Sequence, residues 1–417
     1  PFPQRTSPVR FWVVRRNMMQ QEKTSVARDT VIKRSLCQRA NVLVSMALIL
    51  VTMAACQLPL LGNIMTPPPR SKPAPTPMIT PIYGRQTLRA SNVDEMREVM
   101  TFSSDDDHPI ADVAFSADVG ELVAVHGLSG LVERWSTEDG GLLKTVEVGP
   151  VGVAAANFDG EGIMLAVGAG ATDPAIEAGY AANFLGAKVW NTWTGEQVWE
   201  DLLGQDDPYN LHSTDVTMSQ DGRYLLVVSD GGYEIWDVFK NTPPHMVAIG
   251  YMEPLRDDRP PAVTAALFDQ TGDWVAWAHD GGMITIETWG PQDEGWQLLS
   301  GVQESPLELA IDPARRYLAM ATTESLMLWN LQSWSSSPAW TQTHVYTPAA
   351  GLSFSPDGKL LAVATEAGWQ IRSTKGGKVL LKSGQPAYAV TFSPDGRMLA
   401  VGDIDGTVHL WGVLEDQ

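Results

Sequence analysis

The feature that most constrains the fold is a short motif that recurs along the chain. Its two clearest copies read LSFSPDGKLLAVATEAGWQIR (residues 352–372) and VTFSPDGRMLAVGDIDGTVHLW (residues 390–411). In SPDG, proline fixes φ, aspartate bonds back to the backbone and glycine accepts a positive φ, while the flanking residues alternate as in strands. A small antiparallel sheet cannot bury its apolar faces alone, so recurring copies must stack. The motif therefore predicts an all-β domain of stacked sheets.

The apolar residue directly before the turn marks each copy of the motif. Seven such residues are present, 38 to 60 positions apart: Phe115, Phe158, Met218, Phe268, Ile311, Phe354 and Phe392. The third strand of most copies closes on tryptophan, at Trp135, Trp190, Trp236, Trp329 and Trp411. Arg372 takes that place in the sixth copy, and either Glu287 or Trp289 takes it in the fourth. The spacing predicts seven repeats of one unit.

These repeats resemble the WD40 family over nearly all of residues 83–417, with the closing dipeptide intact as Trp236-Asp237. The resemblance implies a seven-bladed β-propeller that acts as a scaffold for partners. The Gly-His pair that opens family repeats is scarce, since only His108 lies near that place. We therefore expect the blades to depend on packed tryptophan and aliphatic residues more than on the family's histidine network.

The seventh repeat needs an outer strand from elsewhere, because the sequence continues only to Gln417 after Trp411. Residues 95–104, EMREVMTFSS, have strand character and precede the first repeat. We predict that this segment pairs as the outer strand of blade seven. Such pairing closes a ring without leaving a single open sheet edge.

The amino-terminal residues have the pattern of a targeting signal. Basic residues 33–39 precede an apolar run over 41–55, which ends in Met53-Ala54-Ala55 before Cys56. This resembles a bacterial lipoprotein signal, which implies a signal peptide over residues 1–55, with 1–17 as a spurious upstream extension. It also implies lipidation of Cys56 and an extracytoplasmic location on the periplasmic face or the cell surface. The alternative, an uncleaved membrane helix, needs about 20 apolar residues, more than this run supplies.

Residues 56–82 join the lipidation site to the predicted propeller. They contain TPPPRSKPAPTPMITP, in which fixed φ angles and missing N–H donors favour an extended spacer. The only cysteines, Cys37 and Cys56, precede the propeller, so no disulfide within it is expected. The formal net charge is −20, although residues 1–55 are basic. An acidic domain repels phosphate backbones, which disfavours nucleic acid and favours basic protein surfaces or cations as partners.

No catalytic motif is present: the sequence lacks HExxH, GxSxG, a phosphate loop and a dinucleotide fingerprint. We expect no cofactor, no metal site and no enzyme activity, with the acidic run at 105–107 solvating a turn. NTWTGEQVW (191–199) resembles the tryptophan-docking motif of quinoprotein propellers, but it occurs once. The alternative is a quinoprotein-like or hydrolytic propeller with its site in the central channel. Three or more ionisable groups converging on that channel would favour it.

Candidate binding residues lie on loops of the face that the family calls the top. Residues 171–185 lengthen the connection between the second and third strands of blade two. A second long connection, 241–261, joins blades three and four, and two histidines share a repeat position in blades one and four. These features nominate Asp173, Glu177, Tyr180, Phe184, Tyr251, His126 and His279 as binding residues. Neutral drift in loop length is the alternative. We expect a monomeric propeller that binds protein or glycan partners.

Overall fold

The computed structural model describes residues 85–149, 156–169, 186–202, 213–229, 232–241, 244–251, 263–279, 281–289, 296–300, 304–333, 335–343 and 349–414. All seven repeats have strands in these ranges. The predicted signal peptide, Cys56 and the whole linker over residues 56–82 lie outside them. Among the residues described, no helix has the length and hydropathy of a membrane span.

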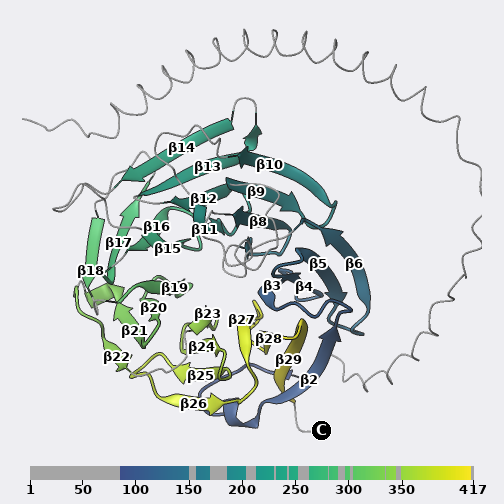
Figure 1. Ribbon diagram of the computed structural model, residues 1–417. Helices are drawn as coiled ribbons and strands as arrows, with labels where there is room; N and C mark the ends of the chain where they lie inside the picture. Colours follow the sequence, from purple (N-terminus) through teal and green to yellow (C-terminus); the bar gives the residue numbers. More distant parts are fainter. Residues whose placement is uncertain are drawn as a thin grey trace, which may run out of the picture. The chain divides into compact units, whose positions relative to one another are not determined.

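Seven antiparallel sheets surround a common centre, each contributing its first strand to the inside of the ring (Figure 1). Blades one to six contain four consecutive strands each, and blade seven combines three carboxy-terminal strands with two from the amino-terminal side. The arrangement is a seven-bladed β-propeller, which confirms the predicted fold class and blade number.

The strands of each blade have the following bounds. Blade one has β3 (Ile110–Phe115), β4 (Glu121–His126), β5 (Leu131–Ser136) and β6 (Leu142–Glu147). Blade two has β7 (Ala156–Phe158), β8 (Met164–Ala169), β9 (Gly186–Asn191) and β10 (Glu196–Leu202). Blade three has β11 (Ser213–Met218), β12 (Tyr224–Ser229), β13 (Gly232–Asn241) and β14 (Pro244–Tyr251). Blade four has β15 (Val263–Phe268), β16 (Trp274–His279), β17 (Met283–Thr288) and β18 (Trp296–Ser300).

The remaining elements follow the same plan. Blade five has β19 (Pro306–Ile311), β20 (Tyr317–Thr322), β21 (Ser325–Asn330) and β22 (Trp340–Thr343). Blade six has β23 (Ala349–Phe354), β24 (Leu360–Thr365), β25 (Gln370–Ser373) and β26 (Val379–Lys382). Blade seven has β27 (Ala387–Phe392), β28 (Met398–Asp403), β29 (Thr407–Leu414), β2 (Arg97–Ser103) and β1 (Arg85–Gln86). Short 3₁₀ helices are η1 (Val93–Glu95) and η2 (Leu331–Ser333).

The first turn of each blade shows why SPDG recurs. In blade seven, the Ser393 hydroxyl accepts the Met398 N–H at 2.9 Å and donates to Asp395 at 2.6 Å, while Gly396 has φ +69°. In blade five, the buried Asp312 takes the place of the serine, and its carboxylate accepts the Arg316 N–H at 2.9 Å. Either side chain fixes the turn because it satisfies a backbone donor that the ladder leaves free.

The third-strand position of blade four was left open between two residues. Glu287 pairs with Val275 in the register in which Trp135 pairs with Leu122 in blade one. Glu287 therefore occupies the repeat position. Trp289 lies two residues further on, and its ring packs 4.8 Å from that of Tyr224 in the preceding blade.

The described residues of the core form seven apolar clusters, each mainly between two neighbouring blades. Trp329 is fully buried between blades four and five, and the ring of Trp199 lies 5.5 Å from that of Trp236 between blades two and three. Tryptophan and aliphatic side chains thus fill the spaces between sheets, as expected from the sequence.

The predicted closing strand is confirmed. β2 pairs antiparallel with β29 from Arg97 opposite Gly412 to Ser103 opposite Thr407, and the two strands lie side by side in Figure 1, blue against yellow. Phe102 of β2 is 1% exposed, and its ring lies 5.6 Å from that of Trp135 in blade one. The closing strand therefore joins two blades through both backbone pairing and packing. β1, which was not predicted, extends the pairing at the end of β29.

Candidate functional site in the central channel

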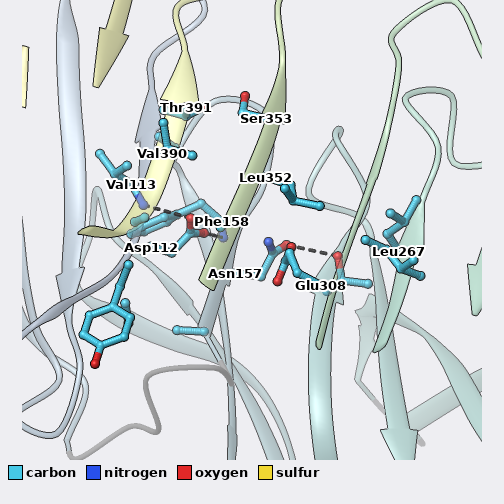
Figure 2. A pocket seen from close by; sticks show the side chains of 18 of the residues that line it. Asp112, Val113, Asn157, Phe158, Leu267, Glu308, Leu352, Ser353, Val390 and Thr391 are labelled. Atoms are coloured by element: carbon cyan, nitrogen blue, oxygen red, sulfur yellow. Dashed lines mark hydrogen bonds between the residues drawn. The ribbon is translucent and has the colours of Figure 1, made fainter. Parts of the chain in front are cut away.

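The centre of the ring holds a cavity of about 530 Å³. Residues from the first strands of all seven blades line it: β3, β7, β11, β15, β19, β23 and β27. Figure 2 shows several of these side chains, with Asp112, Asn157 and Glu308 beside the apolar Leu267 and Leu352. Ligand pockets typically have volumes of about 300–1,000 Å³, so the cavity has the size of a binding site.

Three carboxylates occupy one repeat position in this wall. Asp112, Asp215 and Glu308 each lie three residues before the apolar residue that marks their copy, in blades one, three and five. A shift in strand register immediately precedes each of them, where β3, β11 and β19 pair with their second strands. Such bulges turn a side chain away from the regular alternation. The matching positions of blades four, six and seven hold the small residues Ala265, Gly351 and Ala389.

Two of these acids bind the backbone of the next blade. Asp112 accepts its neighbour Val113 N–H at 2.8 Å and, across the blade boundary, Phe158 N–H at 2.9 Å. Asp215 accepts Val216 N–H at 2.8 Å and Ala266 N–H at 3.4 Å. Burial raises the pKa of each to about 7, although these hydrogen bonds favour the charged form. Both carboxylates therefore connect adjacent inner strands.

Neutral side chains make the same kind of connection in other blades. The Asn157 side-chain oxygen accepts the Met218 N–H at 3.0 Å, which joins blades two and three. The Ser353 hydroxyl accepts the Phe392 N–H at 3.2 Å, which joins blades six and seven. Side-chain to backbone bonds around the channel are thus part of how neighbouring blades are held in register.

Glu308 differs from the other two acids. Within the described residues its carboxylate makes no hydrogen bond and no ion pair. Burial is the largest cause that raises the pKa of Glu308 well above 4.5, and the charges of Asp215 and Asp112 raise it further. The electrostatic fields of the three acids therefore overlap in the channel. Glu308 is the acid whose oxygens are left for a ligand.

This acidic layer was not predicted from the sequence. The prediction used the turn and the closing tryptophan of each copy, and did not use the position three residues before the apolar residue that marks the copy. At that position three acids appear in a strand that otherwise carries Ala or Gly, which is the available signal. The structure thus places three ionisable groups on the channel, the number set above as favouring a channel site.

The structure describes only some of the predicted top-face residues. Residues 170–185 connect β8 to β9 as predicted, but Asp173, Glu177, Tyr180 and Phe184 lie outside the described residues. The expected connection at 241–261 is wrong over 244–251, because these residues form the outer strand β14. Tyr251 is the last residue of that strand, and its side chain lies outside the description.

The two histidines at a shared repeat position lie inside their blades. His126 ends β4 and is 0% exposed, with Nε2 3.0 Å from a Glu133 carboxylate oxygen. His279 ends β16 and is also 0% exposed, with its ring 5.7 Å from that of Trp277. A partner cannot reach either side chain while the blade is closed, so the structure gives both a place in blade packing.

The quinoprotein-like segment forms an ordinary turn between β9 and β10. The Asn191 side-chain oxygen accepts the backbone N–H groups of Trp193 and Thr194 at 2.9 and 2.8 Å, and Gly195 has φ +83°. Trp199 packs inside the protein against Trp236.

The acidic turn before blade one brings ligand atoms of Asp106, Asp107 and His108 within 4.8 Å of one another. Asp106 accepts the His108 N–H at 3.0 Å, and the His108 ring nitrogen Nδ1 lies 2.6 Å from the same carboxylate oxygen. One carboxylate oxygen of Asp106 thus takes part in the hydrogen bonds of the turn itself.

A closed ring of four-stranded blades with a lined channel defines the class of this protein as a β-propeller. Residues 378–412 match the family model described as "WD domain, G-beta repeat". The match runs from β26 through the three inner strands of blade seven. The chain is a seven-bladed β-propeller with a WD40 repeat in blade seven, and propellers of WD40 repeats are in general protein-interaction modules. No curated protein matches the chain.

Proposed function

We propose that this protein is a non-catalytic binding module, held outside the cytoplasm by a lipid on Cys56, which captures protein or glycan partners through the top loops of its propeller. The signal-like residues before Cys56 and the proline-rich spacer support the anchoring. The insertion between β8 and β9 supports the binding face, because binding residues concentrate on loops that a rigid frame positions.

The observation that carries the non-catalytic proposal is the bonding of the channel acids. Hydrolysis by paired carboxylates needs two groups that reach the substrate, one as acid and one as base or nucleophile. Asp112 and Asp215 both bind backbone N–H groups of the next blade. Withdrawing either would leave a buried donor without a partner, which costs about 1–3 kcal/mol. One acid, Glu308, is left, which suits binding better than acid and base catalysis.

Deleting residues 171–185 is expected to abolish capture of partners from a membrane extract by the purified protein. The reason is that the deletion removes the longest loop of the top face while leaving β8 and β9 intact. The measurement is an affinity pull-down with quantitative mass spectrometry.

The matched control replaces residues 290–295, which connect β17 to β18, by glycine and serine. This connection joins a third strand to a fourth, so alternation of antiparallel strands puts it on the opposite face. Capture should survive the control. Unchanged capture after deletion of residues 171–185 would rule out the proposed binding face.

The substitution Cys56→Ser is expected to abolish incorporation of labelled palmitate in a bacterial host and to release the protein from the membrane fraction. Serine offers no thiol for acyl attachment, while the apolar run that precedes it is unchanged. Cys37→Ser is the control and should leave labelling intact. Labelling that persists in Cys56→Ser would refute the lipid anchor.

The acidic layer favours a second candidate, a hydrolytic propeller with its site in the channel. In that case the substitution Glu308→Gln should abolish turnover of glycoside or ester substrates, and deletion of residues 171–185 should leave the catalytic rate constant unchanged. Turnover that survives Glu308→Gln would eliminate a channel site of this kind.

A further inference from the structure

The channel wall carries acidic side chains without basic ones. Four acids line it, Asp112, Asp159, Asp215 and Glu308, and no lysine, arginine or histidine is among its lining residues in the described part of the chain. Charges of one sign in a cleft with low-dielectric walls attract ions of the opposite sign. A ligand of this cavity should therefore be cationic.

Three of the four acids already have backbone partners. Asp112 and Asp215 bind the next blade, and Asp159 accepts the Ile163 N–H at 2.8 Å within its own turn. The Glu308 carboxylate has no such donor among the described residues. Glu308 is half-buried on the channel wall, so its carboxylate oxygens can accept hydrogen bonds from the N–H groups of a cation, and such charge-assisted bonds are strong.

A single metal ion does not fit the spacing of the acidic layer. Calcium binds oxygen ligands at about 2.3–2.6 Å, so carboxylates that share one ion lie close together. Among the described residues, the one group of three acid or histidine side chains whose ligand atoms come within 4.8 Å is Asp106, Asp107 and His108, outside the channel. The cation must be larger than a bare ion in order to meet acids from blades one, three and five.

Apolar side chains line the wall on both sides of Glu308, between blades three and five and between blades five and one. Leu267 of β15, Leu309 of β19, Leu352 of β23 and Val390 of β27 line the same cavity, and three of them are labelled in Figure 2. A ligand with ammonium groups on an aliphatic chain matches this arrangement, because its charges meet carboxylates and its methylene groups meet leucine and valine. The volume of about 530 Å³ admits such a chain.

We propose that the central channel binds an alkylammonium group. Glu308 is its principal anion, and Leu267 and Leu352 on the neighbouring first strands form its apolar wall. Two sources share this chemistry: a free linear polyamine, or a lysine side chain of a bound protein. The proposed channel site does not include the top-face loops. The experiment on the channel and the deletion of residues 171–185 therefore test separate proposals.

The test is isothermal titration of the full chain with spermidine, and in a second arm with the methylamide of Nα-acetyl-lysine. Spermidine should bind, and Glu308→Gln should weaken it at least tenfold. Stronger binding of spermidine identifies a free polyamine as the ligand, and stronger binding of the lysine derivative identifies a protein side chain. The neutral 1,8-octanediol should not bind detectably.

The matched control is Glu324→Gln in the same blade, whose exposed side chain lies outside the channel lining. It should leave the affinity unchanged. Equal losses in both variants would show general attraction to an acidic surface and would overturn the proposal, as would equal affinity of Glu308→Gln and the unmodified protein.

A second measurement needs no variant. Because burial favours the protonated form of Glu308, binding a cation should release a proton, so the affinity, measured from pH 5 to 8, should rise with pH. The heat of binding should also depend on the ionisation enthalpy of the buffer. An affinity that is constant or falls over this range would contradict Glu308 as the anion.

Discussion

Replacing Phe102 by alanine is expected to lower the free energy of unfolding by about 3–5 kcal/mol, the usual cost of emptying a buried aromatic site. Phe102 lies on β2, which closes the ring against β29, and its ring packs against Trp135 of blade one. The substitution therefore weakens the junction of blades seven and one. Urea unfolding followed by tryptophan fluorescence measures the change.

The control is Phe239→Ala on β13, where the side chain is 64% exposed. Surface substitutions usually change stability by less than about 0.5 kcal/mol, so this variant should unfold like the unmodified protein. In Phe102→Ala, β2 should also become the first site of limited proteolysis. A loss below about 1 kcal/mol would show that backbone pairing alone holds the ring closed.

The propeller should be more stable at pH 5 than at pH 8. Burial raises the pKa values of Asp112 and Asp215 from 3.8 to about 7. Between these limits the folded protein holds protons that the unfolded chain has released, so the free energy of unfolding falls as pH rises and levels off above 7. At 1.36 kcal/mol per pKa unit, the two pH units between 5 and 7 correspond to a loss of roughly 3 kcal/mol for each carboxyl.

His409 extends the trend to higher pH. Its ring lies 2.8 Å from Glu98 of the closing strand and 3.1 Å from Asp403, and these carboxylates raise its pKa despite its burial. Stability from the charged ring is complete below its unfolded pKa of about 6.5 and is lost as pH rises through the higher folded value. The pH 5 to 8 comparison therefore includes both contributions.

Variants distinguish the contribution of the buried acids to the pH dependence from that of His409. The double variant Asp112→Asn, Asp215→Asn should lose the part of the slope that these two acids supply between pH 5 and 7, since an amide keeps one acceptor but does not titrate. Asp159 and Glu308, whose pKa values burial also raises, should retain the rest. His409→Gln should lose only the part of the slope that lies above the unfolded histidine pKa of about 6.5. Urea unfolding at half-unit pH steps measures both, and stability that rises from pH 5 to 7 would contradict the burial of these acids.

Local chemistry made much of the fold predictable. Ser393, Asp395 and Gly396 form their turn through contacts within a few residues, so the turn can be predicted from the motif alone. Counting such turns predicted seven blades. The closing strand at 95–104 was predictable because a blade without its fourth strand needs one. These inferences require only strand periodicity, turn chemistry and the need to pair sheet edges.

Other features were not predictable in this way. Residues 244–251 were taken as part of a long connection between blades three and four, but pairing with β13 makes them a strand. His126 and His279 were nominated from their place near loops, and the facing strands bury them. Strand formation and burial at these points depend on neighbours that are distant in the sequence.

The sequence by itself determined the repeating unit and its number, because both follow from turns and alternation within about 40 residues of chain. It also determined the segment that closes the ring, because a blade without its fourth strand needs a partner. Only the tertiary structure decided which side chains line the centre of the ring. Asp112, Asp215 and Glu308 are 93 or more residues apart in sequence, yet closure brings them to one wall. Whether each is held by a backbone donor or left for a ligand depends on the neighbouring blade, which no single repeat contains.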